Sequence, residues 1–220
     1  MPVPDLLAAW RRTSRVVRWT VVALAALSLL GAAAFGGYSW YNAQDARGRL
    51  ALVAAAELAQ QATAAGASAE ARDRALRALE AVLTEYPRFS GAAEAAYRLG
   101  NLRFEAGQHA AARGAYEIAI AKGATATLRS LAAVGIGYTW EAQRDHARAQ
   151  VAFQAALGGL TPKDFLYEEG LLGLARAQEF GGNPAAARET YSRLLKERPD
   201  SRRAADIRSR LASPETPPKQ

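Results

Sequence analysis

The sequence predicts an all-α protein in which an N-terminal transmembrane helix precedes an array of helical repeats. Three observations support this fold class. The 220-residue chain is rich in alanine, the best helix former, and only 8% of its residues are aromatic. A long apolar stretch without charges lies near the N-terminus. Further along the chain, three segments follow one common frame without gaps.

The apolar stretch Trp19–Tyr41 contains no charged residue. As an α-helix it would be roughly 34 Å long, enough to cross a hydrocarbon core of about 30 Å. Trp19 stands at one end and Tyr38, Trp40 and Tyr41 at the other. Aromatic residues are enriched at both interfaces of a membrane, and we therefore predict a transmembrane helix over residues 19–41.

Residues 1–18 form a basic leader before the span. Its charged residues are four arginines and one aspartate: Arg11, Arg12, Arg15, Arg18 and Asp5. The positive-inside rule keeps such a leader in the cytoplasm and sends the rest of the chain across the membrane. The arginine-rich, lysine-poor composition is typical of a GC-rich bacterium. The expected location is a single-pass protein of the bacterial inner membrane with a periplasmic C-terminal domain.

A cleaved signal peptide is the alternative to a retained anchor. The small residues Ala32, Ala33 and Ala34 resemble a cleavage site after an apolar run, and cleavage would leave Phe35 as the mature N-terminus. The leader is long for a signal peptide, and the apolar stretch continues to Tyr41. These features favour a retained helix, but the sequence leaves cleavage after Ala34 open.

Charge and cysteine content exclude several classes of function. The formal net charge is +7, of which the leader carries +3, and the rest is spread over helices of mixed sign. We therefore expect no nucleic-acid binding, since no recognition motif accompanies the charge. The chain has no cysteine, which excludes disulfides, a lipoprotein attachment site and a thiol nucleophile.

The repeat frame covers Ala96–Ile120, Ala133–Leu157 and Leu171–Leu195, each with the pattern of two helices joined by a short turn. A small residue recurs in the first helix and an aromatic residue in the second. The matching positions are Leu99, Gly100, Ala112, Tyr116 and Ala119; Ile136, Gly137, Ala149, Phe153 and Ala156; and Leu174, Ala175, Ala187, Tyr191 and Pro199. A weaker unit fits Ala75, Leu79, Val82, Leu83 and Pro87, after a leading helix over Arg47–Ala65.

This pattern resembles the tetratricopeptide repeat, whose typical period is 34 residues. The resemblance implies a right-handed α-α superhelix, a solenoid of about three to four helix-turn-helix units within residues 42–204. The units lie near 56–92, 93–129, 130–167 and 168–204. We expect a capping helix over 200–212, with a polar outer face, and a disordered tail over 213–220.

Packing explains the repeated residue types. Small residues such as Gly100 and Gly137 allow two helices to approach closely, and Tyr116, Phe153 and Tyr191 should fill the core between neighbouring units. Asp145 is expected to cap a helix, and Asn183 with Pro184 to begin another.

Residues for catalysis or metal binding do not converge in the sequence. His109 and His146 occupy equivalent positions in successive units, too far apart for one metal ion, and we predict that both lie at helix starts. No phosphate-binding loop or nucleophile elbow is present. We therefore predict no enzyme activity, no catalytic residues, no cofactor and no metal.

In tetratricopeptide proteins the first helices of the units line a concave groove. The resemblance places nine residues there: Tyr97, Asn101, Phe104, Val134, Tyr138, Glu141, Leu172, Arg176 and Glu179. Their mixed apolar and polar character suits unfolded or amphipathic segments of other proteins. The alternative is that these residues simply pack the solenoid.

Two functions remain open at this stage. The first is an adaptor or chaperone-like module that binds proteins in the periplasm. Its architecture resembles the ancillary subunits of the bacterial secretion translocon, which implies translocon subunits, periplasmic chaperones or secreted clients as partners. The second is a structural scaffold for another cell-envelope complex, with lateral packing through the small residues Gly31, Gly36 and Gly37. A homo-oligomer is compatible with both.

Overall fold

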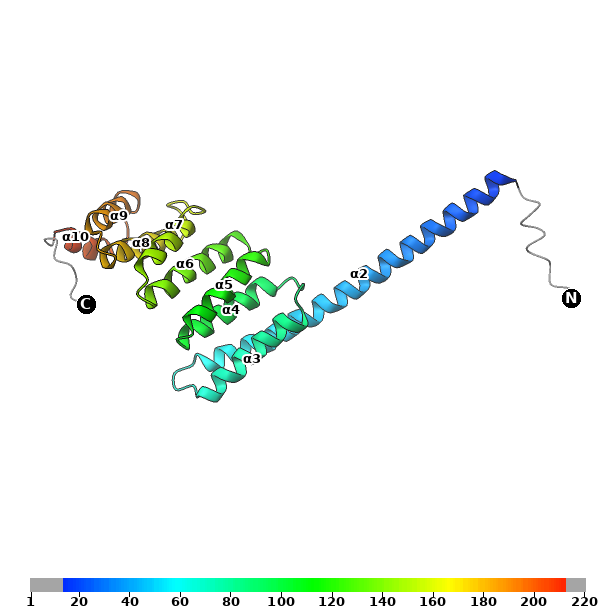
Figure 1. Ribbon diagram of the computed structural model, residues 1–220, viewed down its shortest axis with the longest axis horizontal. Coiled ribbons are helices and arrows are strands. Elements are labelled where there is room, and N and C mark those ends of the chain that lie inside the picture. Colours follow the sequence, from blue (N-terminus) through cyan, green and yellow to red (C-terminus); the bar gives the residue numbers. More distant parts are fainter. Residues whose placement is uncertain (1–13, 213–220) are drawn as a thin grey trace. The chain divides into compact units, whose positions relative to one another are not determined.

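The computed structural model describes residues 14–212, and this part of the chain contains helices and no strand (Figure 1). The prediction of an all-α fold is confirmed. The helices are α2 (Arg15–Ala62), α3 (Ala69–Glu85), α4 (Ala92–Glu105), α5 (His109–Ala121), α6 (Ala126–Ala142), α7 (His146–Leu157), α8 (Tyr167–Phe180), α9 (Pro184–Glu197) and α10 (Ala204–Ala212). Most of the leader and the whole predicted tail lie outside the described residues.

The chain divides after Ala46 into two compact units, and α2 contributes residues to both. In the first unit the helix is apolar and its large hydrophobic side chains are exposed; Trp19 and Phe35 are each 73% exposed. Among residues 14–212, one helix is long and apolar enough to cross a membrane, namely α2. A signal sequence would meet the same criterion. The predicted span, residues 19–41, lies within this helix.

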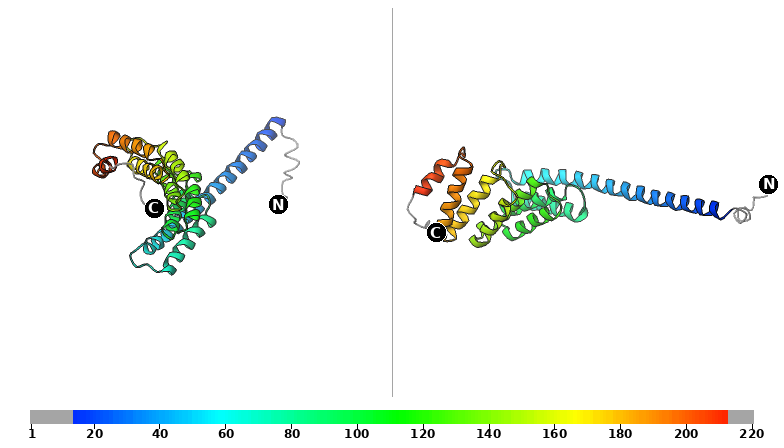
Figure 2. Two further views of the ribbon diagram at one scale, coloured as in Figure 1. Left: turned by 60° about the vertical axis from the view of Figure 1, so that its left-hand side comes forward. Right: turned by 90° about the horizontal axis from the view of Figure 1, so that it is seen from above.

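In the second unit, successive helices pack beside one another as a solenoid (Figure 2). The end of α2 shares a core cluster with α3 and forms the first helix pair with it. The pairs α4–α5, α6–α7 and α8–α9 form the next three. The leading helix of the first pair ends at Ala62, three residues before the expected end. Helix α10 packs against α9 and begins at Ala204, because residues 202 and 203 form a turn.

Side chains cap several of these helices. The side chains of Ser68, Thr125, Asp145 and Asn183 accept hydrogen bonds from backbone N–H groups three residues on. These bonds satisfy donors that the first turn of a helix leaves unpaired. The predicted cap at Asp145 and the predicted start at Asn183 and Pro184 are therefore confirmed.

Two aromatic rings are each packed between glycines of neighbouring units. A Cβ atom added to Gly137 on α6 or to Gly173 on α8 would lie 2.5 Å from the ring of Phe153. In the same way, a Cβ on Gly100 or Gly135 would lie 2.5 or 2.8 Å from the ring of Tyr116. Each ring thus contacts its own unit and the next one, as expected for core residues that join the units.

The turn within each of the last three units uses a left-handed residue at one equivalent position. Gly107 and Gly182 have φ values of 72° and 79°, but Arg144 occupies this position in the middle unit with φ of 59°. Its backbone N–H donates to the carbonyl of Glu141 at 2.9 Å, as the N–H of Gly107 donates to that of Phe104. The turn therefore requires a left-handed backbone conformation at this position, which glycine adopts readily and a residue with a Cβ atom, such as Arg144, does not.

We expect Arg144→Gly to raise the free energy of unfolding by about 1 kcal/mol, because it removes the cost of a left-handed non-glycine residue. Denaturant unfolding of the full-length protein in detergent, followed by circular dichroism, measures this change. Gln143→Gly, one residue earlier at the end of α6, is the control and should be neutral or destabilising. Equal effects of the two substitutions would show that the turn is not strained.

Candidate protein-binding groove

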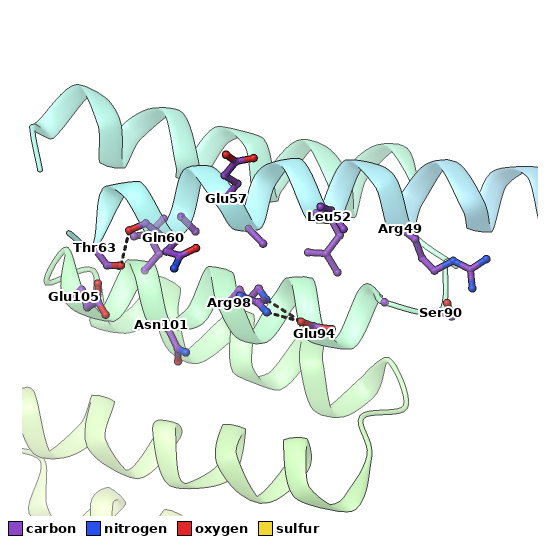
Figure 3. Close-up of a pocket in the computed structure, with 15 residues that line it drawn as sticks. Arg49, Leu52, Glu57, Gln60, Thr63, Ser90, Glu94, Arg98, Asn101 and Glu105 are labelled. Atoms are coloured by element: carbon purple, nitrogen blue, oxygen red, sulfur yellow. Dashed lines mark hydrogen bonds and ion pairs between the residues drawn. The ribbon is translucent and has the colours of Figure 1, made fainter.

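A groove of about 990 Å³ lies between the end of α2 and α4, the first helices of the first two helix pairs (Figure 3). A second cavity of about 520 Å³ lies between α4 and α6. Helix α4 is the common wall, since five residues line both cavities: Ser90, Gly91, Glu94, Arg98 and Asn101. The groove therefore follows the first helices of three successive units.

The larger groove has an apolar floor with a polar margin. Leu52, Ala56 and Ala59 of α2 face Leu102 of α4 across it, and Val53, also a lining residue, is 66% exposed. Hydrogen-bonding side chains are present at Gln60, Thr63, Ser90 and Asn101. Such a surface can bury apolar side chains of a ligand and offer polar groups to its backbone.

Glutamates and arginines complete the lining. Glu94 and Arg98, one helical turn apart on α4, form an ion pair in which Glu94 Oε1 accepts from Arg98 Nε at 2.9 Å and Nη2 at 2.7 Å (Figure 3). Because both side chains are about half exposed, this pair contributes little to stability. The groove is lined by five charged residues, and in this pair two of the five charges cancel.

Two of the nine residues assigned to the groove from the sequence line these cavities. Asn101 lines both, and Tyr97 lines the smaller one. Asn101 is held by Tyr116, whose hydroxyl donates to Asn101 Oδ1 at 2.8 Å. Burial raises the pKa of Tyr116, which keeps this hydroxyl a donor. The ring of Tyr97 lies 5.8 Å from that of Tyr116. The core aromatic residue thus positions two residues of the groove.

The other seven residues line neither cavity, and their side chains pack against or bond to other side chains of the solenoid. Val134 and Leu172 are only 4% and 6% exposed and belong to core clusters. The Phe104 ring lies 5.3 Å from that of His109. These three residues pack within the solenoid.

The remaining four assigned residues tie α6 to α8 and α8 to the end of the solenoid. Arg176 on α8 donates to both carboxylate oxygens of Glu141 on α6, at 2.8 and 3.0 Å. Its guanidinium also lies 5.6 Å from the ring centre of Tyr138. The hydrogen bond with Glu141 raises the pKa of Arg176. Glu179 accepts from Tyr191 and from Arg210 of α10, each at 3.2 Å.

Tyr138 is a partly buried member of this network. Its hydroxyl donates to Glu169 of α8, and burial followed by this hydrogen bond raises the pKa of Tyr138 to about 12. Arg203, in turn, lies 3.5 Å from Glu169. Side chains on α6 and α8 therefore form hydrogen bonds with one another, whereas α2 and α4 leave a groove between them.

The residues assigned to the groove from the sequence include none from the end of α2, which supplies one wall. Residues 49–63 belong to the first helix pair, which lacks the aromatic residue of the repeat frame and has Leu79 in its place. The signal that was present is the pattern of Leu52, Ala55 and Ala62, which are buried, against Val53 and Glu57, which are exposed.

The two histidines begin helices, as predicted. His109 is the first residue of α5 and His146 the first of α7, and each ring packs on a phenylalanine, Phe104 or Phe180. The Nδ1 atoms of both are buried and accept no hydrogen bond from the described residues. Residues 14–212 contain no group of three or more potential metal ligands.

Comparison with known proteins identifies the repeats. Residues 94–122 and residues 141–211 each match a tetratricopeptide repeat model. The crystal structure of MamA protein is similar to this chain with a TM-score of 0.51 and 20% sequence identity, over 61% of this chain and 67% of that one. No curated protein matches the chain in sequence. The chain therefore contains tetratricopeptide repeats in a solenoid of the corresponding fold, which indicates a protein–protein interaction module and is typically non-catalytic.

Proposed function

We propose that this protein is a membrane-anchored adaptor, chaperone-like in its action, whose groove between α2 and α4 binds a segment of a partner protein. One observation carries the proposal: the groove of about 990 Å³ is open to solvent and has an apolar floor. Residues 49–62 of α2 extend over about 21 Å, which matches a helical segment of about 14 residues or an extended segment of about six. Both are common modes of peptide recognition.

The first unit of the chain supports a retained anchor. Helix α2 begins with Arg15 and Arg18, and the apolar stretch that follows ends in Tyr38, Trp40 and Tyr41. This order of basic, apolar and aromatic residues favours a cytoplasmic N-terminus and a periplasmic repeat domain in the inner membrane of a bacterium. We take residues 19–41 as the span and residues 42–204 as the repeat domain, closed by α10.

The secretion translocon is the partner that this architecture favours. A single span with a cytoplasmic N-terminus and a short periplasmic tetratricopeptide domain resembles the ancillary subunits of that complex. In this role the groove would receive segments of secreted clients or of periplasmic chaperones as they approach the channel.

A scaffold for another envelope complex is the second candidate, and glycines of α2 favour it. Gly31, Gly36 and Gly37 have no other side chain within 4 Å of the position of an added Cβ. Small residues in a membrane helix allow another helix to approach closely. A scaffold of this kind would lose its partners when the three glycines are replaced by leucine, whereas an adaptor that binds through the groove would keep them.

The groove is tested by in-cell photocrosslinking from a reactive amino acid at Val53, combined with Ala56→Trp. Ala56 lines the groove, and an indole there would fill the space above Leu52. We expect crosslinks to partner proteins to fall by about tenfold, because the buried apolar contact is lost.

Ala54→Trp is the matched control, since Ala54 is exposed on the same helix and does not line the groove. It should leave the crosslinks unchanged. Thermal unfolding of both variants shows whether the fold is retained. Equal crosslinking in the two variants would mean that the groove is not the binding site.

A further inference from the structure

The groove between α2 and α4 differs in charge from the rest of the protein. The chain carries a formal net charge of +7. The groove is lined by three glutamates, Glu57, Glu94 and Glu105, and by two arginines, Arg49 and Arg98. Its lining is therefore acidic by one charge within a basic protein.

The excess negative charge is at Glu57 and Glu105. Glu94 is neutralised by Arg98, as described above. Glu57 and Glu105 are exposed, and neither forms an ion pair or a hydrogen bond with another side chain in the described part of the protein. Arg103, in the last turn of α4, does not neutralise Glu105, because it binds Glu80 at 2.6 Å and the carbonyl of Ala111 at 3.2 Å.

The backbone adds to the negative potential at the same end. Helices α2 and α4 lie side by side with Thr63, Gln60 and Glu105 at one end of the groove and Arg49 and Ser90 at the other (Figure 3). Both helices therefore end on the side of Glu105, where the carbonyl groups of the last turn carry partial negative charge. Gln60 and Thr63 add neutral hydrogen-bonding groups to the lining at this end.

We propose that the segment bound in this groove is a basic amphipathic one. Its apolar side chains contact Leu52, Val53 and Leu102, and its lysines or arginines lie against Glu57 and Glu105. An acidic segment would place like charges together in a partly desolvated site, which costs affinity and excludes such partners. This inference rests on the proposed function, because it names the chemistry of the segment that the groove receives.

Three synthetic peptides of about 14 residues test the inference with the full-length protein in lipid nanodiscs. They share one helical pattern of leucines and differ in their polar positions, which hold lysine, glutamine or glutamate. Fluorescence anisotropy measures the affinity of each. We expect the lysine peptide to bind about tenfold more tightly than the glutamate peptide, with the difference shrinking as salt is raised from about 0.05 to 0.5 M.

The double variant Glu57→Lys, Glu105→Lys should abolish this preference or reverse it. The milder Glu57→Gln, Glu105→Gln removes the charges without adding new ones and should bring the three peptides to similar affinities. Glu189→Lys on α9 is the control for net charge, since Glu189 is exposed and lies outside the groove. It should leave the preference unchanged.

The outcomes separate this inference from the proposed function. Equal affinity for the three peptides, lost in Ala56→Trp, would overturn the basic ligand and leave the groove as a binding site. A lysine preference that survives both double variants would also overturn it. Failure of every peptide to bind would overturn it as well, and crosslinking from Val53 would then decide separately whether the groove receives partner proteins.

Discussion

Phe153→Ala is expected to lower the free energy of unfolding of the repeat domain by about 4 kcal/mol. The ring is 0% exposed and lies between Gly137 and Gly173, which have no side chains that could move into the space it leaves. The cost of removing a buried side chain rises with the volume of the cavity that remains. The substitution also removes the contact of the ring with Gly173 on α8, so we expect it to weaken the packing of the neighbouring unit as well.

Val151→Ala provides the matched control, because Val151 is on the same helix and is 67% exposed. Its effect should stay below about 0.5 kcal/mol. Denaturant unfolding of the full-length protein in detergent gives both values. A loss below about 2 kcal/mol for Phe153→Ala would indicate that the two glycine-bearing helices close over the cavity.

Adding a single methyl group is expected to have opposite effects at two helical glycines. Gly173→Ala should destabilise the domain by about 2 kcal/mol, since the new Cβ would meet three atoms of the Phe153 ring at 2.5 to 2.8 Å. Gly114→Ala should stabilise it by about 0.5–1 kcal/mol, because no atom lies within 4 Å and alanine is the better helix former.

The same unfolding assay measures both glycine variants, and a double-mutant cycle identifies the cause. In a Phe153→Leu background the penalty of Gly173→Ala should be smaller, since a leucine can adopt another rotamer. If both alanine substitutions changed stability in the same direction, helix propensity and not the ring contact would govern these positions.

Much of the fold could be predicted because its determinants are local or periodic. The frame that relates Tyr116, Phe153 and Tyr191 fixes which helix faces are buried, and all three side chains are at most 4% exposed. The cap at Asp145 depends only on a backbone N–H three residues on. Neither inference needed to know which helices meet.

The position of the groove was harder to predict because it depends on contacts between units. Tyr138, Glu141 and Arg176 match the groove-facing pattern, yet their side chains pair across α6 and α8. No periodicity within one unit indicates that Arg176 finds a carboxylate 35 residues earlier. The same holds for Gly135 and Gly173, whose significance appears only when the ring of the preceding unit is placed against them.

The two-glycine packing of the rings also limits how such an array can be lengthened. The α6–α7 pair carries a glycine for its own ring, Gly137, and another, Gly135, for the ring before it. A tandem copy of this pair would present Gly135 to Phe153 and could be inserted without a clash. The α4–α5 pair has Arg98 at the position equivalent to Gly135, opposite Leu79 in the preceding unit. Its duplication would place Tyr116 against an arginine. The α6–α7 pair and the α8–α9 pair, which carries Gly173 at this position, are therefore suited to serve as modules for extension, whereas the α4–α5 pair is not.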